Sequence, residues 1–306
     1  MAPGVEVRAW AARDNSGHLS PFTFSRRATG PGDVKFKILF CGVCHSDLHQ
    51  ILNDWGSALY PLVPGHAIVG EVTEVGSEVK AFKVREIVGV GCMVNLCQTC
   101  DSCTCCMEQY CIKGLVWTYT DKDYDGTVPQ GGYSTIMVCS QEFVLKMPTN
   151  LPLDAAAPLL CAGITVYGPM KHYQMDVPGK HFGVVGLGGV GHMAVKFGKA
   201  FAAHPLDRYL STLKIDDRLV VVGIPDKPLS INALSLINAQ RDVGGSAIGG
   251  IKETQEMLDF CGKHNITCMI EKIPMSYINT AMERLSKSDV KYCFVIYIAS
   301  TLEYKD

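Results

Sequence analysis

The chain has 306 residues, of which 47% are hydrophobic and 19% charged, and its formal net charge is −2. This composition favours a folded protein of one large or two ordinary domains, and the lack of a basic excess argues against nucleic acid or an anionic membrane as the main partner. The first residues lack the apolar segment of a secretory signal, and no run of about 18 apolar residues predicts a spanning helix. We therefore expect a cytoplasmic protein whose 14 cysteines are reduced thiols.

The N-terminal half, residues 1 to about 161, reads as a series of short β-strands. Alternating segments such as EVTEVGSEV and YSTIMVCSQEFVLKM are separated by Gly and Pro. Strands of this length and spacing predict a barrel-like β region.

Three widely separated stretches of the chain carry metal-ligand side chains. The stretch CGVCHSDLH contains Cys41 and Cys44, VPGHAIVG contains His66, and LLCAGITVYG contains Cys161. A Cys, a His and a Cys far apart suit a catalytic zinc, which uses three protein ligands and keeps a fourth position open. Each residue alone is weak evidence for a metal site, because a His after a Pro-Gly turn is often structural and a buried Cys often acts as a small hydrophobe. Their joint occurrence carries the prediction.

The stretch CQTCDSCTCCMEQYC contains six cysteines in fifteen residues. Four of them follow the spacing C-x2-C-x2-C-x7-C, which is typical of a closed, structural zinc site with four thiolates. These four are Cys97, Cys100, Cys103 and Cys111. Cys105 and Cys106 are competing ligands, and a set of packed, unligated thiols is the alternative without a metal.

The segment from His181 to Phe201, HFGVVGLGGVGHMAVKFGKAF, has the pattern of a strand, a tight glycine turn and an amphipathic helix. Gly186, Gly188 and Gly191 form the motif G-x-G-x-x-G, in which the chain approaches a pyrophosphate at a helix N-terminus. A lone motif of this kind is weak, but its position between a strand and a helix strengthens the prediction. Further on, YINTAMERLSKSD reads as a helix and KYCFVIYI as a strand.

The order of these motifs resembles the zinc-dependent medium-chain alcohol dehydrogenases, and within them the plant cinnamyl alcohol dehydrogenases. The resemblance is carried by CGVCHSDLHQ, YPLVPGHAIVGEVTEVGSEV, VGVGCMVNLCQTCDSC, EQYC, QGGYST, LLCAGITVYGPM, GVVGLGGVGHMAVKFGKAF, GGIKETQEMLDF and NTAMERL. It implies an α/β protein with two domains. Residues 1–161, with 272–306 returning to them, would form an α+β catalytic domain with a GroES-like β-barrel core. Residues 162–271 would form a truncated Rossmann-type domain with a parallel sheet.

The resemblance also assigns roles at the metal site. It makes Cys44, rather than Cys41, the first ligand of the catalytic zinc, with His66 and Cys161 as the others. Asp47 would accept a hydrogen bond from the ring of His66 and fix its tautomer; the alternative for Asp47 is a surface turn residue.

By the same resemblance, Ser46 would receive the proton of the alcohol and pass it through the cofactor ribose to His49 and water. A hydroxyl suits this relay because it donates and accepts at once. The substrate pocket would contain Trp117, whereas for Trp55 simple packing is the better interpretation.

The implied cofactor is NADP(H). Its contacts would be Ser46, Thr165, Gly186, Leu187, Gly188, Gly189, Val190, Gly191, Gly245, Cys268, Met269 and Ile270. For the last three, ordinary strand core is an equally good interpretation.

The chain departs from the family pattern in three places. Ala67 stands where the family has a Glu beside the zinc, and Arg85 stands where relatives have a Gly. After Phe201 about fifty residues of the relatives are missing, and with them the adenosine-ribose pocket and central strands of the parallel sheet. Asp207 and Asp216 lie where an NAD-binding acid is expected, but we reject both, because their segment resembles a later part of the family.

In that later part, RLVVVG, Arg218 to Gly223, is the expected strand. With the central strands gone, we expect its residues Leu219 to Gly223 to pair with Val184 to Gly186.

These observations support three functional hypotheses. The first is an NADP-dependent zinc oxidoreductase that interconverts cinnamyl-type aldehydes and alcohols for lignin, with two zinc ions per chain and a homodimeric assembly. The second is a catalytically impaired, zinc-binding paralogue that has lost its affinity for the cofactor. The third, weaker hypothesis is a thiol-rich zinc reservoir or redox responder.

Overall fold

The computed structural model describes residues 4–177, 183–201, 215–224, 231 and 233–302. Its first strands and helices are β1 (Val5–Ala12), β2 (Leu19–Arg26), β3 (Asp33–Val43), α1 (His45–Leu52), β4 (Ile68–Val75), β5 (Ile87–Val90), β6 (Met93–Leu96), α2 (Asp101–Thr104), β7 (Leu115–Trp117), β8 (Ile136–Ser140) and β9 (Leu145–Lys146). There follow α3 (Leu153–Ala156), α4 (Ala162–His172), α5 (Gly189–Phe201), β10 (Arg218–Val221), α6 (Ala233–Ile237), β11 (Asp242–Gly245), α7 (Ile251–His264), β12 (Ile270–Ile273), α8 (Ile278–Ser286), β13 (Cys293–Tyr297) and α9 (Ile298–Thr301).

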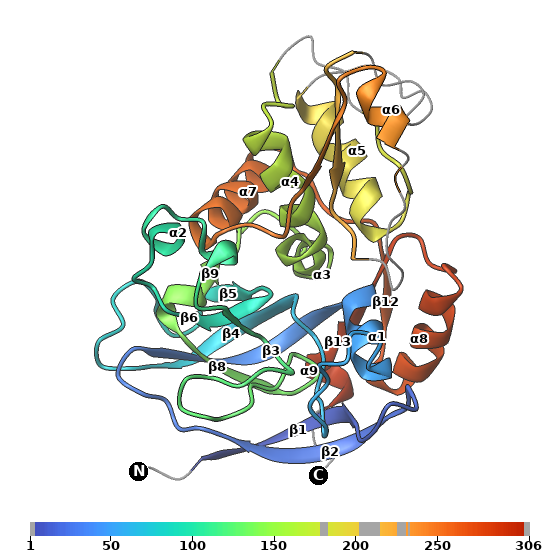
Figure 1. The fold of residues 1–306 in the computed structure, drawn as a ribbon. Helices are drawn as coiled ribbons and strands as arrows, with labels where there is room; N and C mark the ends of the chain where they lie inside the picture. Colours follow the sequence, from blue (N-terminus) through green and yellow to red (C-terminus); the bar gives the residue numbers. More distant parts are fainter. Residues whose placement is uncertain (1–3, 178–182, 202–214, 225–230, 232, 303–306) are drawn as a thin grey trace.

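One seven-stranded sheet organises the β-rich end of the molecule. Its strand order is β12-β13-β3-β4-β5-β9, and β8 also pairs with β3. All of these pairs are antiparallel except β12 with β13. The hairpin of β1 and β2 lies at the far end from helices α4 to α7 (Figure 1). The β-rich N-terminal half that the alternating segments predicted is therefore confirmed.

Two clusters of buried apolar side chains form the core, one around the sheet and one around the helices. The first surrounds the sheet and includes Phe36, Ile38, Tyr133 and Phe294. The second lies around α4, α5 and α7 and includes Leu159, Tyr167, Phe197 and Met257.

Helix α8 confirms the helix predicted from YINTAMERLSKSD. It buries Ile278, Ala281, Met282 and Leu285, a spacing that places all four side chains on one face of a helix. The strand predicted after it is also present, as β13, whose first four residues are buried.

The predicted pairing within the shortened parallel sheet is wrong. Residues 183–187 are not in a strand, and β10 pairs in parallel with β11, from Arg218 opposite Asp242 to Val221 opposite Gly245. Parallel strands are normally buried on both faces. Here Val185 and Leu187 are 63% and 61% exposed. This short run thus lacks the cover a parallel strand requires, and α6 supplies the crossover for β10 and β11 instead.

Arg85 occupies a backbone conformation that favours glycine. Its φ is +74°, and a non-glycine residue there costs about 1–2 kcal/mol. A glycine at this position would in turn lower the free energy of unfolding by about 0.4–1 kcal/mol, because it raises the conformational entropy of the unfolded chain. We therefore expect Arg85→Gly to raise the free energy of unfolding by up to about 1 kcal/mol in a urea titration. Lys83→Gly, at an exposed position without positive φ, is the matched control and is expected to lower it.

Candidate metal sites and catalytic residues

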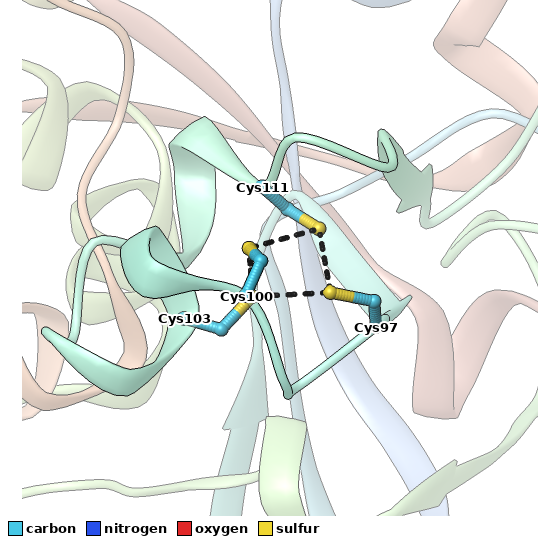
Figure 2. Close-up of side chains that lie close together, drawn as sticks. All are labelled: Cys97, Cys100, Cys103 and Cys111. Atoms are coloured by element: carbon cyan, nitrogen blue, oxygen red, sulfur yellow. Dashed lines mark hydrogen bonds between the residues drawn. The ribbon is translucent and has the colours of Figure 1, made fainter.

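The four regularly spaced cysteines meet in one cluster (Figure 2). Their Sγ atoms are separated by 3.8 Å (Cys97 to Cys103), 3.3 Å (Cys100 to Cys103), 4.0 Å (Cys100 to Cys111) and 3.4 Å (Cys111 to Cys97). Four sulfurs bound tetrahedrally at about 2.3 Å from zinc lie about 3.8 Å apart. The donor set and its spacing therefore fit a structural zinc ion.

The loop that carries this cluster rests on a short ladder. Strands β6 and β7 pair so that Leu96 lies opposite Leu115, which brings the two ends of the loop together. The two remaining cysteines of the loop, Cys105 and Cys106, are exposed, whereas Cys100 and Cys103 are buried. The exposed pair is outside the group of ligand atoms found among the described residues.

Protons and a metal ion would compete for the four sulfurs of this cluster. The backbone N–H of Thr99 lowers the pKa of the Cys97 thiol to about 6, whereas burial and the neighbouring sulfurs raise the pKa of Cys103 to about 12. The cluster alone therefore does not hold four thiolates, and a divalent cation would compensate their charge.

The second predicted set of ligands also converges. Cys44 Sγ lies 3.8 Å from Cys161 Sγ, and His66 Nε2 lies 3.2 Å from Cys161 Sγ. The three ligand atoms lie within 4.8 Å of one another. Cys41 is buried elsewhere in the sheet and is outside this group. The set of two thiols and one imidazole suits a zinc ion with an open fourth position.

Each of these ligands stands at the boundary of an element. Cys44 is the N-cap of α1, and Cys161 directly precedes α4. His66 follows Gly65, whose φ is +102°. A Cβ at Gly65 would lie 2.7 Å from the ring of Tyr133. This turn therefore requires glycine in order to present His66.

Asp47 lies behind His66, on the side of the ring away from the sulfurs. Its carboxylate Oδ1 is 3.1 Å from His66 Nδ1, so Nε2 is the nitrogen that faces the sulfurs. Asp47 also accepts from the backbone N–H of Cys44 and thereby completes a capping box at the start of α1.

Burial opposes the charge of Asp47, but His66 and Tyr119 outweigh it and lower the pKa of the carboxyl. Burial likewise opposes the charge of His66, and Asp47 raises its pKa. Binding of a metal at Nε2 would therefore displace a proton.

The proposed proton relay contains one residue that the sequence did not reveal. Ser46 Oγ lies 3.6 Å from Cys44 Sγ, and His49 lies one turn further along α1. His49 Nδ1 contacts Asp54 Oδ2 at 2.7 Å, and its ring lies 5.2 Å from that of Trp55. Asp54 orients the imidazole, and Trp55 packs on it, as the sequence favoured for that residue. Only the position of Asp54 just after α1 hints at this role.

The glycine turn before α5 keeps its close backbone packing. Gly186 has a φ of +88°, and a Cβ on Gly191 would lie 1.8 Å from the carbonyl oxygen of Gly186. Helix α5 follows, which confirms the helix predicted after the motif.

The other predicted contact residues come from several elements, and the N–H of Met269 donates to His192 Nε2, next to the glycine turn, at 3.2 Å. Thr165 is buried in α4, Gly245 ends β11, and Cys268 is buried just before β12, which Ile270 begins. Trp117 ends β7 and is 42% exposed. Ala67, which departs from the family pattern beside the metal ligands, is buried and has no side-chain atom that could bind a metal. Asp207 lies outside the described residues.

A hollow of about 620 Å³ lies over β1 and β2 and is lined by Arg8, Trp10 and Phe22, among others. None of its lining residues belongs to the predicted sites. Among the described residues no single helix has the length and apolarity to cross a membrane, although Leu153–Leu160 and Ala162–His172, bent by 54°, meet those requirements as a pair. Leu159, Leu160 and Ile164 of that pair lie in the second buried cluster.

A zinc-type donor set and a glycine turn before a helix are the two features expected of a medium-chain dehydrogenase, and the comparisons with known proteins agree with this class. Residues 30–149 match the model of the alcohol dehydrogenase GroES-like domain. The chain is 51% identical to a probable mannitol dehydrogenase of Mesembryanthemum crystallinum (96% of this chain, 95% of the relative) and 52% identical to cinnamyl alcohol dehydrogenase 8 of Arabidopsis thaliana (97% of each).

Two solved structures share the fold along nearly the whole chain. A cinnamyl alcohol dehydrogenase of Sorghum bicolor gives a TM-score of 0.93 at 45% identity, with 98% of this chain and 100% of that chain covered. The CAD of Helicobacter pylori, solved with NADP(H), gives 0.90 at 36% identity, with 97% and 99% covered. The chain belongs to the plant family of cinnamyl alcohol dehydrogenase-like proteins, and it is by family an oxidoreductase.

The alignments also bear on the predicted gap. The match to the Mesembryanthemum protein runs over 344 positions, whereas 96% of this chain of 306 residues is about 294 residues. About 50 aligned positions therefore have no counterpart here, which agrees with the predicted size of the gap. Its position after Phe201 remains a prediction.

Proposed function

We propose that this chain is an NADP(H)-dependent zinc oxidoreductase that interconverts cinnamyl-type aldehydes and alcohols. The observation that carries the proposal is the convergence of Cys44, His66 and Cys161, with Asp47 placed against the far nitrogen of the imidazole. Family membership supports the reaction class. The substrate class is proposed from the relatives named cinnamyl alcohol dehydrogenase. Overall identity does not select it, because a probable mannitol dehydrogenase is nearly as similar to this chain.

A zinc ion held by Cys44, His66 and Cys161 would supply a Lewis acid for the oxygen of the substrate. Asp47 keeps the proton of His66 on Nδ1 and so leaves Nε2 available as a ligand. Cys97, Cys100, Cys103 and Cys111 would hold a second, structural zinc, which makes two per chain.

The chain's own side chains would move the proton. Ser46, beside Cys44, takes the hydroxyl proton of the substrate, and His49 delivers it to water from its partly exposed position on α1. The contact between His49 Nδ1 and Asp54 Oδ2, at 2.7 Å, would hold the imidazole in place for this transfer.

The cofactor would lie at the glycine turn from Gly186 to Gly191, where backbone N–H groups and the N-terminus of α5 receive its pyrophosphate. NADP(H) would supply the reducing equivalents. Thr165, Gly245 and the segment Cys268 to Ile270 would complete its surroundings, and Trp117 would border the aromatic substrate. We propose the domain boundaries 1–161 with 272–306, and 162–271, together with a homodimer.

One structural observation favours a second candidate, the zinc-binding paralogue with impaired catalysis. Residues 183–187 are not in a strand, and β10 and β11 form a sheet of only two strands among the described residues. A Rossmann-type sheet that lacks its central strands loses groups that hold the adenosine end of the cofactor. Ala67 adds to this, because it removes the family's acidic side chain beside the metal.

The test combines three measurements on the purified, zinc-supplemented chain. We expect two zinc ions per chain by elemental analysis, saturable quenching or enhancement of NADPH fluorescence in the micromolar range, and NADPH-dependent reduction of coniferaldehyde. His66→Ala is the control, and it should hold one zinc and lose turnover while retaining NADPH binding. Two zinc ions without NADPH binding would instead establish the second candidate.

A further inference from the structure

The buried carboxylate of Asp47 collects more donors than a zinc-bound histidine requires. Asp47 is 0% exposed. Its Oδ1 lies 3.1 Å from His66 Nδ1, 3.0 Å from the N–H of Gly65 and 2.6 Å from the hydroxyl of Tyr119. Its Oδ2 lies 2.9 Å from the N–H of Cys44 and 3.3 Å from the hydroxyl of Tyr133. Two tyrosine hydroxyls thus complete a set of five donors.

The two tyrosines are not equivalent. Tyr119 makes the shorter contact, and its oxygen also lies 3.3 Å from His66 Nδ1. Its ring lies 5.8 Å from the imidazole. Tyr133 donates only to the other carboxylate oxygen, at the longer distance, and among the described residues it makes no hydrogen bond with the histidine ring. Tyr119 therefore closes a triangle with Oδ1 and Nδ1, whereas Tyr133 does not.

We infer that Tyr119 is a positioning residue for the ligand His66: its hydroxyl donates to Asp47 Oδ1 and holds that oxygen against the Nδ1–H of the ring. The inference rests on the proposed zinc role of His66. It differs from the role of Asp47 itself, because Asp47 accepts directly from the ring of His66, whereas Tyr119 acts by holding the carboxylate that accepts.

The physical reason is the geometry of a buried carboxylate. Once the hydroxyl is gone, Oδ1 retains only the N–H of Gly65 and the Nδ1–H of His66, so the position of this oxygen is held less firmly. The acceptor that fixes the ring plane and tautomer of His66 is then less well placed. Groups that orient a ligating histidine contribute about 10–100-fold to metal affinity. Tyr119 acts through one such group, so we expect an effect near the lower end, about tenfold.

The experiment measures metal release rather than turnover. Wild type, Tyr119→Phe and Tyr133→Phe are loaded with zinc, and release to the chromogenic chelator 4-(2-pyridylazo)resorcinol is followed over time. The cluster of four cysteines serves as an internal reference within each chain. We expect release from the site of His66 to be about tenfold faster in Tyr119→Phe, with less than a threefold change in Tyr133→Phe and no change at the four-cysteine cluster.

Other outcomes separate the two levels of the proposal. Equal release rates in wild type and Tyr119→Phe would overturn the role of Tyr119 and leave the proposed function intact. A wild type that holds no zinc at the site of His66 would overturn the proposed function. If both zinc ions leave faster in Tyr119→Phe, the residue is merely structural.

A second measurement covers the case in which Tyr119→Phe does not fold. In the zinc-loaded wild type, ¹⁵N-imidazole spectra should show His66 as the Nδ1–H tautomer, with that proton slow to exchange and close to the Tyr119 ring. A rapidly exchanging proton, or one without a contact to Tyr119, would overturn the inference.

Discussion

Replacement of Cys103 by serine is expected to remove one zinc ion per chain and to destabilise the protein by at least about 3 kcal/mol. Structural zinc contributes about 10–16 kcal/mol of apparent binding free energy in small zinc domains, and a site that loses one of four thiolates forfeits much of it. Cys103 Sγ lies 3.3 Å from Cys100 Sγ and 3.8 Å from Cys97 Sγ, inside the cluster. Elemental analysis and thermal unfolding with and without a chelator measure both effects.

Cys105→Ser is the matched control, because it removes a thiol two residues away that is exposed and outside the cluster. We expect it to leave the zinc content at two and the melting temperature unchanged. Equal losses in both variants would show that Cys105 takes part in ligation, as the sequence alone allowed. Unchanged zinc content in Cys103→Ser would contradict the structural zinc itself.

The contrast between these cysteines illustrates what spacing can predict. A ligand set within fifteen residues is restricted by the reach of one loop, so the regular spacing favoured Cys97, Cys100, Cys103 and Cys111 while Cys105 and Cys106 remained competing ligands. The set of Cys44, His66 and Cys161 spans more than a hundred residues. No local pattern relates such positions, and only the resemblance to a family selected Cys44 over Cys41.

The hydrogen-bond donors around Asp47 could not be predicted from the sequence, for a different reason. Tyr119 and Tyr133 come from separate loops that meet only because the sheet folds them together, and a single tyrosine in a sequence carries no sign of its hydrogen-bond partner. The QGGYST stretch did contain Tyr133, but it entered only as part of the family resemblance. Asp54 likewise reads as an ordinary polar residue after a helix.

The error at Val184 to Gly186 has a physical cause as well. A short apolar run before a glycine turn predicts a strand only if neighbouring strands cover it. The sequence showed that such neighbours were missing but not which of the remaining strands would meet. Strands β10 and β11, with α6 between them in the sequence, pair with each other.

Replacement of Gly191 by alanine is expected to weaken NADPH binding at least about 100-fold, which corresponds to about 2.8 kcal/mol. The added Cβ would lie 1.8 Å from the carbonyl oxygen of Gly186 and 2.9 Å from its carbonyl carbon. Both are backbone atoms, so no side chain can move aside. The turn that brings the glycine backbone to the pyrophosphate must open, and the N-terminus of α5 moves with it.

Gly183→Ala provides the comparison, since a Cβ there meets no atom within 4 Å and the residue has no positive φ. It is expected to bind NADPH as the wild type does in the same fluorescence titration, and both variants should retain their zinc. Binding by Gly191→Ala within threefold of wild type would place the cofactor away from this turn. The contact between residue 191 and the carbonyl of Gly186 is local, so the comparison of the two variants tests the glycine turn itself and not the short sheet behind it. A difference between the two variants would show that the turn still binds the cofactor.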